Sequence, residues 1–165
     1  MRLRIVAMVM VGLVCLAAPM WAGDAKTKFK TAEPKHFNRS EGVEVSPEFS
    51  DLLYAELKQE LKKAKLFQDI VGEGEVVDAA DAPNSVSIDG NLLEYKKGSV
   101  VKAALIGFGS GLRSLRAQIT VKRMSDQQAL YDKELKVKAD PRWNEKVLAK
   151  FLANKIAKEL KSNLH

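Results

Sequence analysis

Two stretches in the carboxyl-terminal half of the chain alternate apolar and polar residues, and this alternation constrains the fold more than any other feature. The first spans residues 115–122 and the second spans residues 131–137, with turn-forming residues 125–128 between them. Successive side chains of a strand point to opposite faces, so each stretch gathers its apolar residues on one face. These apolar residues are Leu115, Ala117, Ile119, Val121, Tyr131, Leu135 and Val137. The pattern predicts an antiparallel hairpin with one buried and one solvated face.

Two amphipathic helices are predicted to cover the buried face of this hairpin. The first is expected over residues 47–65, after Ser46 and Pro47, which suit a helix cap and a first turn. Its apolar residues at helical spacing are Phe49, Leu52, Leu53, Leu57, Leu61 and Ala64. The second is expected over residues 140–163, where a polar residue followed by proline again opens the pattern. Its apolar residues are Trp143, Val147, Leu148, Phe151, Leu152, Ile156, Leu160 and Leu164.

Three further strands complete the predicted sheet. A weak extended stretch at residues 28–37 contains Pro34, which cannot donate to a sheet ladder, so this strand is expected at an edge or to end early. Residues 66–71 form a short apolar run of strand length. Residues 85–95 alternate, but the apolar positions change parity near residues 90–92. A β-bulge at that point would explain the change.

The order of these elements defines the fold class. One strand and one helix are followed by four strands and a last helix, which is the order β-α-β-β-β-β-α. Because the hairpin strands are apolar on one face only, both helices must cover that same face. The expected fold is therefore of the α/β (α+β) class. It is a two-layer sandwich with a mixed, mainly antiparallel sheet and two amphipathic helices on one face.

The first 22 residues have the layout of a secretory signal peptide. A basic start is followed by an apolar run and by small residues that end at Ala22. Cleavage is expected after Ala22, which leaves residues 23–165 as a single domain in the periplasm or outside the cell. An uncleaved membrane anchor is the alternative, because residues 5–22 carry no charge and reach the lower edge of a spanning length.

The single cysteine, Cys15, lies inside this leader. It follows Val14, whose bulk does not fit a lipoprotein cleavage site, so no lipid anchor is expected. Without the leader the chain has no cysteine. That composition excludes disulfide scaffolds, thiolate metal sites and cysteine nucleophiles from the exported form.

No residue pattern in the chain points to catalysis. The two histidines, His36 and His165, do not stand beside residues that would complete a catalytic triad. The acidic segment, residues 69–81, holds five acids and no base but lacks the spacing of a calcium loop, so it is expected to be a solvated loop. The glycines of residues 105–111 lack the lysine and the following helix of a phosphate-binding loop. The chain is predicted to be a non-enzyme without metal or cofactor.

The connecting segment, residues 98–112, is the strongest candidate for a functional surface. It joins two predicted strands, is too long for a tight hairpin and is rich in apolar residues, which must be buried somewhere. Two arrangements are open. The segment either folds back over the core or projects as an arm that docks a partner subunit or a membrane surface. The candidate interaction residues are Leu105, Ile106 and Phe108, flanked by the bases Lys96, Lys97, Lys102, Arg113 and Arg116.

The charge of the chain is unevenly distributed. The whole chain carries a net charge of +6, and removal of the two leader arginines leaves +4. With −5 in the acidic segment, the rest of the exported chain carries +9, which favours head-to-tail contact between copies. The basic flanks of the connecting segment suit an anionic membrane surface, a polyanionic envelope polymer or an acidic partner, and a solvated basic face is the plain alternative. Nucleic acid is not an expected partner, because the chain is exported and has no aromatic and basic recognition motif.

Several short motifs, in this order, resemble the bacterial domain-of-unknown-function family 4410 (DUF4410). They are Pro47-Glu48-Phe49, Leu66-Phe67, residues 89–99, residues 107–111 and the carboxyl-terminal hairpin. The resemblance covers about residues 28–162 and implies an exported, envelope-associated α/β domain. The chain departs from related accessory proteins in lacking a lipidation cysteine, and its turn at residues 125–128 lacks a glycine often found there. The family has no established catalytic residues, so none is transferred.

These observations lead to one functional hypothesis and two alternatives. The chain is predicted to be a non-catalytic exported envelope module that binds a protein partner or self-associates through the connecting segment. The first alternative is a small-ligand-binding or enzymatic domain without a local motif. The second is a peripheral binder of membrane surfaces.

Overall fold

The computed structural model describes residues 29–106 and 111–164, and within them it shows one mixed sheet with helices on one side. The strand order is β3-β1-β4-β5-β6, and β2 pairs with β4 beyond the end of β1. The strands are β1 (Thr31–Pro34), β2 (Asn38–Arg39), β3 (Asp69–Ile70), β4 (Ser85–Lys96), β5 (Arg113–Arg123) and β6 (Ala129–Ala139). The helices are α1 (Phe49–Ala64), α2 (Val100–Ile106), α3 (Glu145–Leu164) and the 3-10 turn η1 (Ala82–Asn84). The expected class, an α+β sandwich with a mixed sheet, is confirmed.

The antiparallel part of the sheet consists of β4, β5 and β6. In the β5-β6 hairpin, Ala117 faces Leu135 and Val121 faces Tyr131, so the apolar residues of both strands share one face as the alternation predicts. In β4 the register against β5 shifts between Leu92 and Glu94. This irregularity confirms the bulge that the change of parity indicates.

The first strand lies inside the sheet and not at its edge. β1 runs parallel to both β3 and β4. It ends at Pro34 as expected, and the next residue, Lys35, donates its backbone N–H to the Ile88 carbonyl at 3.0 Å. The expectation of an early end is therefore confirmed, whereas an edge position is wrong. The short β3 takes the edge, because the chain returns from α1 on the outer side of β1.

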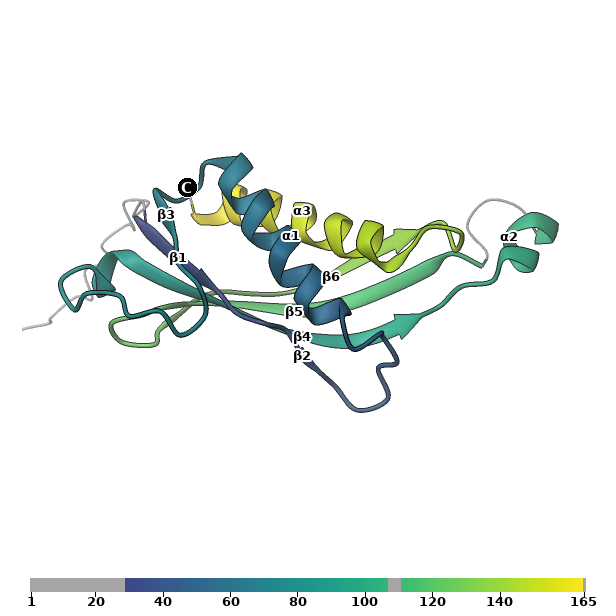
Figure 1. The fold of residues 1–165 in the computed structure, drawn as a ribbon, viewed down its shortest axis with the longest axis horizontal. Helices are drawn as coiled ribbons and strands as arrows, with labels where there is room; N and C mark the ends of the chain where they lie inside the picture. The colour runs from purple at the N-terminus through teal and green to yellow at the C-terminus, as the bar shows by residue number, and fades with distance from the viewer. Residues whose placement is uncertain (1–28, 107–110, 165) are drawn as a thin grey trace, which may run out of the picture.

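Both long helices pack side by side against the same face of the sheet (Figure 1). Their apolar stripes are buried or half-buried, as the sequence predicts. The large side chains without exposure are Phe49, Leu53, Leu57, Leu61, Leu148, Leu152, Ile156 and Leu160. The exceptions are Trp143 and Phe151, which were expected in the stripe of α3 but are 45% and 38% exposed.

The helices begin later than the proline signals suggest. α1 begins at Phe49, and its N-cap Glu48 makes no side-chain cap hydrogen bond. α3 begins at Glu145, because the Asn144 side-chain oxygen accepts the Val147 backbone N–H at 3.1 Å and so caps the helix there. Asp140 instead binds the side chain and backbone N–H of Arg142 in the preceding turn. Trp143 therefore lies in that turn and outside the helix.

The opposite face of the sheet is not solvated along its whole width. Glu33 and Ser87, which point away from the helices, are only 6% and 2% exposed. The acidic segment passes beneath them, and its Gly74 backbone N–H donates to Glu33 Oε1 at 2.8 Å. The expected solvated loop thus covers one end of this face, although most of its own residues remain exposed.

The predicted leader of residues 1–22, its cleavage site and Cys15 lie outside the described residues. None of the helices that the structure describes combines the length and the apolar composition needed to cross a bilayer.

Candidate functional site: an exposed apolar end

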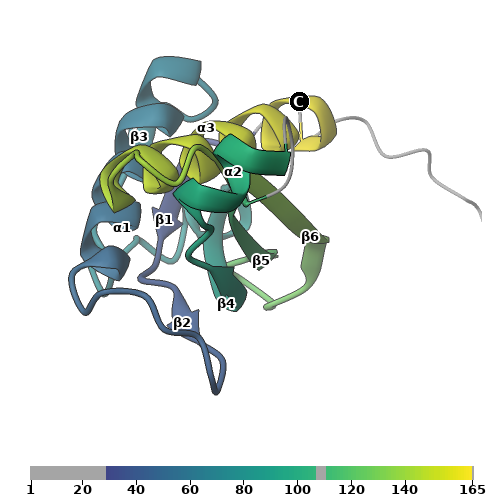
Figure 2. The ribbon, with the colours of Figure 1, turned by 90° about the vertical axis from the view of Figure 1, so that its right-hand side faces the viewer.

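The connecting segment forms one end of the molecule. β4 ends at Lys96, β5 begins at Arg113, and α2 lies between them, beyond the ends of these strands (Figures 1 and 2). The helix itself was not predicted, because a seven-residue apolar run does not reveal its period. Of the two arrangements open for this segment, its described part adopts the projecting one.

Close backbone packing fixes the base of this segment. Gly98 has a φ of +77°, and a Cβ at this position would lie 2.6 Å from both the Arg113 nitrogen and the Gly111 oxygen. Ser99 donates its backbone N–H to the Gly111 carbonyl at 2.7 Å. Gly98 is therefore a position where only glycine lets the two ends of the segment meet.

The outer side of α2 exposes large apolar side chains. Val100, Val101 and Leu105 are 51%, 65% and 79% exposed. Trp143 and Phe151, from the turn before α3 and from its second turn, are also exposed and form an edge-to-face pair with ring centroids 5.4 Å apart. We call these five residues the end surface: Val100, Val101, Leu105, Trp143 and Phe151.

The guanidinium of Arg113 binds the turn before α3 and the base of the connecting segment. It donates to the backbone oxygens of Trp143 at 2.7 Å and Pro141 at 3.3 Å, and it also donates to the Lys97 carbonyl at 3.4 Å. These bonds tie the turn before α3 to the end of β4. Arg113, expected as a charge that attracts a partner, is thus occupied in holding the end surface together.

Arg116 lies elsewhere, on the sheet face that points away from the helices. Its guanidinium makes two hydrogen bonds of 2.7 Å to Glu134 and one of 3.4 Å to Glu94. The pKa of Glu134 is lowered by Arg116, and that of Glu94 is lowered by Lys96 and then by Arg116. Arg116 and Lys96 therefore form part of a cross-strand ion-pair group and not of the end surface.

Of the remaining expected residues, Lys97 and Lys102 stay beside the end surface. Lys97 lies 3.7 Å from Glu44, and Lys102 is exposed on α2. Ile106 is the last residue of α2, and Phe108 lies outside the described residues. The structure thus places Leu105 and two of the five expected bases at α2 and its base, and it exposes Trp143 and Phe151, which sequence reasoning assigned to the core.

A second polar group, also missed from the sequence, surrounds His36. Its Nδ1 lies 2.5 Å from Glu73 Oε2, its Nε2 lies 3.4 Å from Asp51, and its ring stacks on Tyr54 at 4.1 Å. The His36 backbone N–H also donates to Glu73 Oε2, and these two contacts lower the pKa of Glu73. The Tyr54 hydroxyl accepts the Glu73 backbone N–H at 3.1 Å. The group anchors the acidic segment to α1, and it joins residues too far apart in sequence for a local motif.

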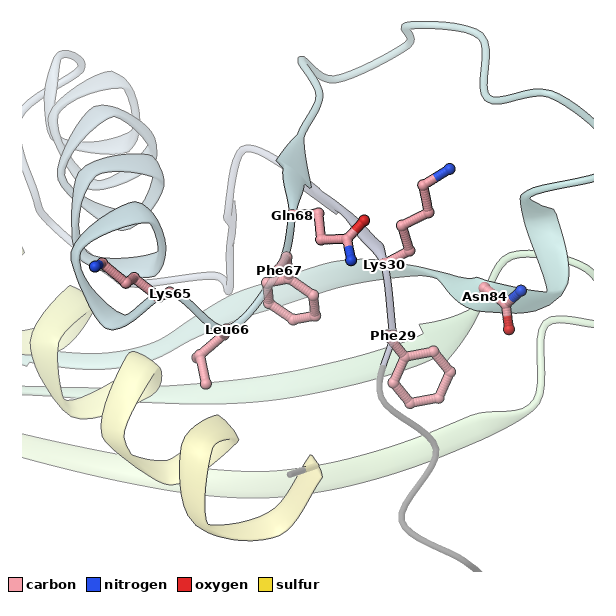
Figure 3. A pocket seen from close by; sticks show the side chains of 7 residues that line it. All are labelled: Phe29, Lys30, Lys65, Leu66, Phe67, Gln68 and Asn84. Atoms are coloured by element: carbon pink, nitrogen blue, oxygen red, sulfur yellow. The ribbon is translucent and has the colours of Figure 1, made fainter.

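A hollow beside the start of β1 offers little chemistry. It measures about 450 Å³ and is lined by Phe29, Lys30, Lys65, Leu66, Phe67, Gln68 and Asn84. The ammonium ends of Lys30 and Lys65 point away from the space beside the Phe29 and Phe67 rings (Figure 3). Lys30 is paired with Asp81 at 3.2 Å. The lining holds no acid, histidine or hydroxyl group, and no cluster of metal-ligating side chains occurs among the described residues.

Comparisons with known proteins identify the fold and the family. Among solved structures, the PelC dodecamer from Paraburkholderia phytofirmans is similar, with a TM-score of 0.56, 12% identity, and coverage of 82% of this chain and 89% of that one. Hypothetical protein CT253 from Chlamydia trachomatis matches with a TM-score of 0.53, 9% identity, and coverage of 82% and 98%. Protein XCC0632 from Xanthomonas campestris matches with a TM-score of 0.51, 8% identity, and coverage of 87% of this chain and 85% of that one. At such identities these likenesses show the fold alone.

No curated protein matches the sequence. The family model described as "Domain of unknown function (DUF4410)" matches residues 39–157, which include all of α1, the β4-β5-β6 sheet and most of α3. The resemblance inferred from the short motifs is therefore confirmed, and the chain belongs to the DUF4410 family.

Proposed function

We propose that this protein is a non-catalytic, exported envelope module that binds a protein through its end surface. The observation that carries the proposal is the exposure of Val101 and Leu105 on a helix that projects beyond the sheet. Burying such side chains against a partner gains roughly 25 cal/mol per Å² of apolar area. The neighbouring Trp143 adds a residue type that is enriched among the strongest contributors to protein interfaces. Export is supported by the leader-like pattern of the first 22 residues.

A protein partner fits this surface better than a lipid bilayer does. Peripheral binding to anionic lipid depends on bases that remain available to head groups. Here Arg113 binds three backbone oxygens and Arg116 is paired with Glu134 and Glu94. The dodecameric assembly of PelC, a protein of similar fold, is a further reason to consider protein contacts.

An enzymatic role has less support from the described residues. His36 is the one histidine among them, and its two ring nitrogens face carboxylates of Glu73 and Asp51. A histidine that acts as a general base needs a nucleophile or substrate proton within hydrogen-bond reach. No hydroxyl nucleophile is hydrogen-bonded to His36 in the described part of the chain, and its two hydrogen bonds to Glu73 hold the acidic segment.

The proposal is tested by placing a photo-crosslinking amino acid at Leu105 in the full chain, expressed in a bacterial host and irradiated in the intact envelope. Protein adducts are expected at this position. The control carries the same amino acid at Ala55, an exposed residue of α1, a helix that lies away from α2 (Figure 1). Adducts should also be lost when Val101→Asp is added, because a buried carboxylate opposes docking.

The stability of the Val101→Asp variant shows whether Val101 is an interface residue or a core residue. An exposed residue should change the free energy of unfolding by only about 0.5 kcal/mol. The proposal is wrong if Leu105 gives no more adducts than Ala55. It is also wrong if Val101→Asp lowers the free energy of unfolding by more than about 2 kcal/mol, as expected for a core position.

A further inference from the structure

The acidic segment lies at the end of the molecule opposite to the end surface (Figure 1). It immediately precedes the start of β4, whereas α2 follows the end of that strand. Gly74 of this segment bonds Glu33, which pairs with Ser87 near the start of β4, and the remaining residues 87–96 of that strand lead away from it over about 30 Å at roughly 3.3 Å per residue. Contacts between the two ends therefore need two molecules.

The acidic segment exposes charge together with an apolar residue. Asp69, Glu75 and Asp78 are exposed and have no ion-pair partner within residues 29–106 and 111–164. Between them Val76 is 96% exposed, the highest value among the large hydrophobic residues of the described chain. An exposed valine inside a run of carboxylates matches a surface that is apolar and basic.

The end surface has that complementary character. Residues 96–113 contain no acid, and two of their four bases, Lys97 and Lys102, lie beside it, with Lys97 3.7 Å from Glu44. Lys97 and Lys102 are exposed beside Val101 and Leu105. Opposite charges around an apolar contact orient two partners and speed their encounter.

The acidic segment is also held in one place before any partner arrives. His36 binds Glu73 through its ring and its backbone N–H, and Tyr54 accepts a hydrogen bond from the Glu73 backbone. Glu33 binds Gly74 from beneath the sheet. A surface that is ordered in advance loses less conformational entropy on binding.

We infer that the protein associates head to tail with a second copy of itself. The acidic segment of one molecule docks on the end surface of the next, with Val76 among Val101 and Leu105 and with Glu75 and Asp78 facing Lys97 and Lys102. This inference rests on the proposed function, because it names the occupant of the same surface. The two contact surfaces differ and lie at opposite ends. End-to-end docking leaves one surface open on each outer molecule and continues into a ring or a filament, whereas reciprocal docking of two antiparallel molecules closes a dimer, and sedimentation velocity distinguishes the two by size.

Disulfide cross-linking between two cysteine variants tests this geometry. The full chain carries Cys15→Ser, so that the introduced thiol is the only one. Val76→Cys and Leu105→Cys are prepared separately, mixed and treated with a mild oxidant. A disulfide requires Cα atoms within about 7 Å. The mixture should yield a covalent dimer, whereas each variant alone should stay monomeric on a non-reducing gel. Ala55→Cys replaces Val76→Cys in the control mixture.

A charge reversal gives a second measurement that does not depend on thiol placement. Glu75→Lys with Asp78→Lys should weaken self-association at least about tenfold in sedimentation velocity, and Lys97→Glu with Lys102→Glu should do the same. Mixing the two reversed proteins should restore association between them. The matched control is Lys158→Glu, at an exposed position on α3.

The outcomes separate this inference from the proposed function. Efficient linkage of Leu105→Cys with itself would show a symmetric contact and overturn the head-to-tail arrangement while leaving the end surface as an interface. The inference would also be wrong if both charge-reversed proteins kept the assembly size of the unchanged protein. If Leu105 gave photo-adducts but the acidic-segment variants did not change self-association, the result would support the proposed function with a different partner. If Leu105 gave no photo-adducts and the acidic segment had no effect on self-association, the proposed function and the head-to-tail inference would both be wrong.

Discussion

Phe37 and Gly90 show how a single residue determines local packing in this protein. Gly90 lies on the face of β4 that points toward the helices, and a Cβ at this position would overlap the ring of Phe37. Phe37 is 4% exposed and belongs to the core. The aromatic ring thus fills the space that a side chain at Gly90 would otherwise take.

We expect Gly90→Ala to lower the free energy of unfolding by about 1–3 kcal/mol, because the added methyl group forces the Phe37 ring out of its position. Urea unfolding followed by circular dichroism measures the change. Ser87→Ala on the same strand is the control. The Ser87 hydroxyl is buried without a hydrogen-bond partner among the described residues, so its removal should be neutral or stabilising. Equal effects of the two variants would contradict the role given to Phe37.

Glu60 is a buried carboxylate at the contact between α1 and α3. It is 6% exposed and accepts hydrogen bonds from Lys63 Nζ at 2.7 Å and from Asn154 Nδ2 at 2.9 Å. These two partners, Lys63 first, hold the pKa of Glu60 below its ordinary value of 4.5. The ionised form is therefore favoured in the folded protein relative to the unfolded chain.

A carboxylate whose pKa is lowered on folding stabilises the fold at pH values above its unfolded pKa. This contribution is lost as the pH falls through the lower pKa of the folded state. We expect Glu60→Gln to lower the free energy of unfolding by about 1 kcal/mol at pH 7, because a charge-assisted hydrogen bond becomes a neutral one. The difference from the unchanged protein should shrink below about pH 4.5. Thermal melts between pH 3 and pH 7 measure it, and a difference that grows toward low pH would be inconsistent with this account.

At the scale of elements, the turn before α3 decides where that helix begins. The sequence pattern favours a start at the Asp140-Pro141 pair, whereas the helix starts after Asn144, whose side chain caps it. The four-residue difference places Trp143 on the surface, where Arg113 holds its carbonyl oxygen at 2.7 Å. One cap thus determines whether an aromatic residue joins the core or the end surface.

We expect Asn144→Ala to cost about 1 kcal/mol of folding free energy, since the Val147 backbone N–H loses its acceptor. Asn144→Asp, which keeps a side-chain oxygen at the cap, should remain close to the unchanged protein. Chemical denaturation measures both. If the two variants were equally unstable, the cap would not be the feature that starts the helix.

The connecting segment illustrates which elements a local pattern reveals. α1 and α3 are long enough for their helical period to stand out, and both were expected. α2 has seven residues, all but Lys102 apolar, so it lacks a polar face that would indicate its period. Its projection beyond the sheet depends on the meeting of Gly98 with residues 111–113, which local sequence does not reveal.

For the whole molecule, the separation of charge along the long axis is the feature with the widest consequences. The acidic segment occupies one end, and the base-rich residues 96–106 and 111–113 occupy the other. The sequence shows the two groups but not their distance. The length of β4 and the parallel placement of β1 beside it determine that the groups lie at opposite ends.

Self-association should accordingly depend on salt. We expect the dissociation constant to rise severalfold between about 0.05 M and about 0.5 M sodium chloride, because the screening length falls from more than 10 Å to a few Å. Sedimentation velocity at several salt concentrations measures the change. An association that strengthens with salt would indicate a mainly apolar contact, without the charge pairing inferred for Glu75 and Asp78.

The sequence by itself determined the layers of this protein. The alternation in β5 and β6 and the helical stripes of α1 and α3 each depend on neighbours within a few residues, so their periods indicate which side must be buried. It also indicated the bulge in β4, because a change of parity is a local event. The family resemblance rests on the same kind of short motif.

Only the tertiary structure decided which residues meet across the fold. The interior place of β1, the contact of His36 with Glu73, and the bond of Arg113 to the Trp143 carbonyl all join residues that are distant in sequence. Such contacts depend on the path of the whole chain, and a periodic pattern contains no information about that path. The candidate surface was therefore found only in part from the sequence: Leu105 and its neighbouring lysines were expected, whereas the aromatic pair was assigned to the core.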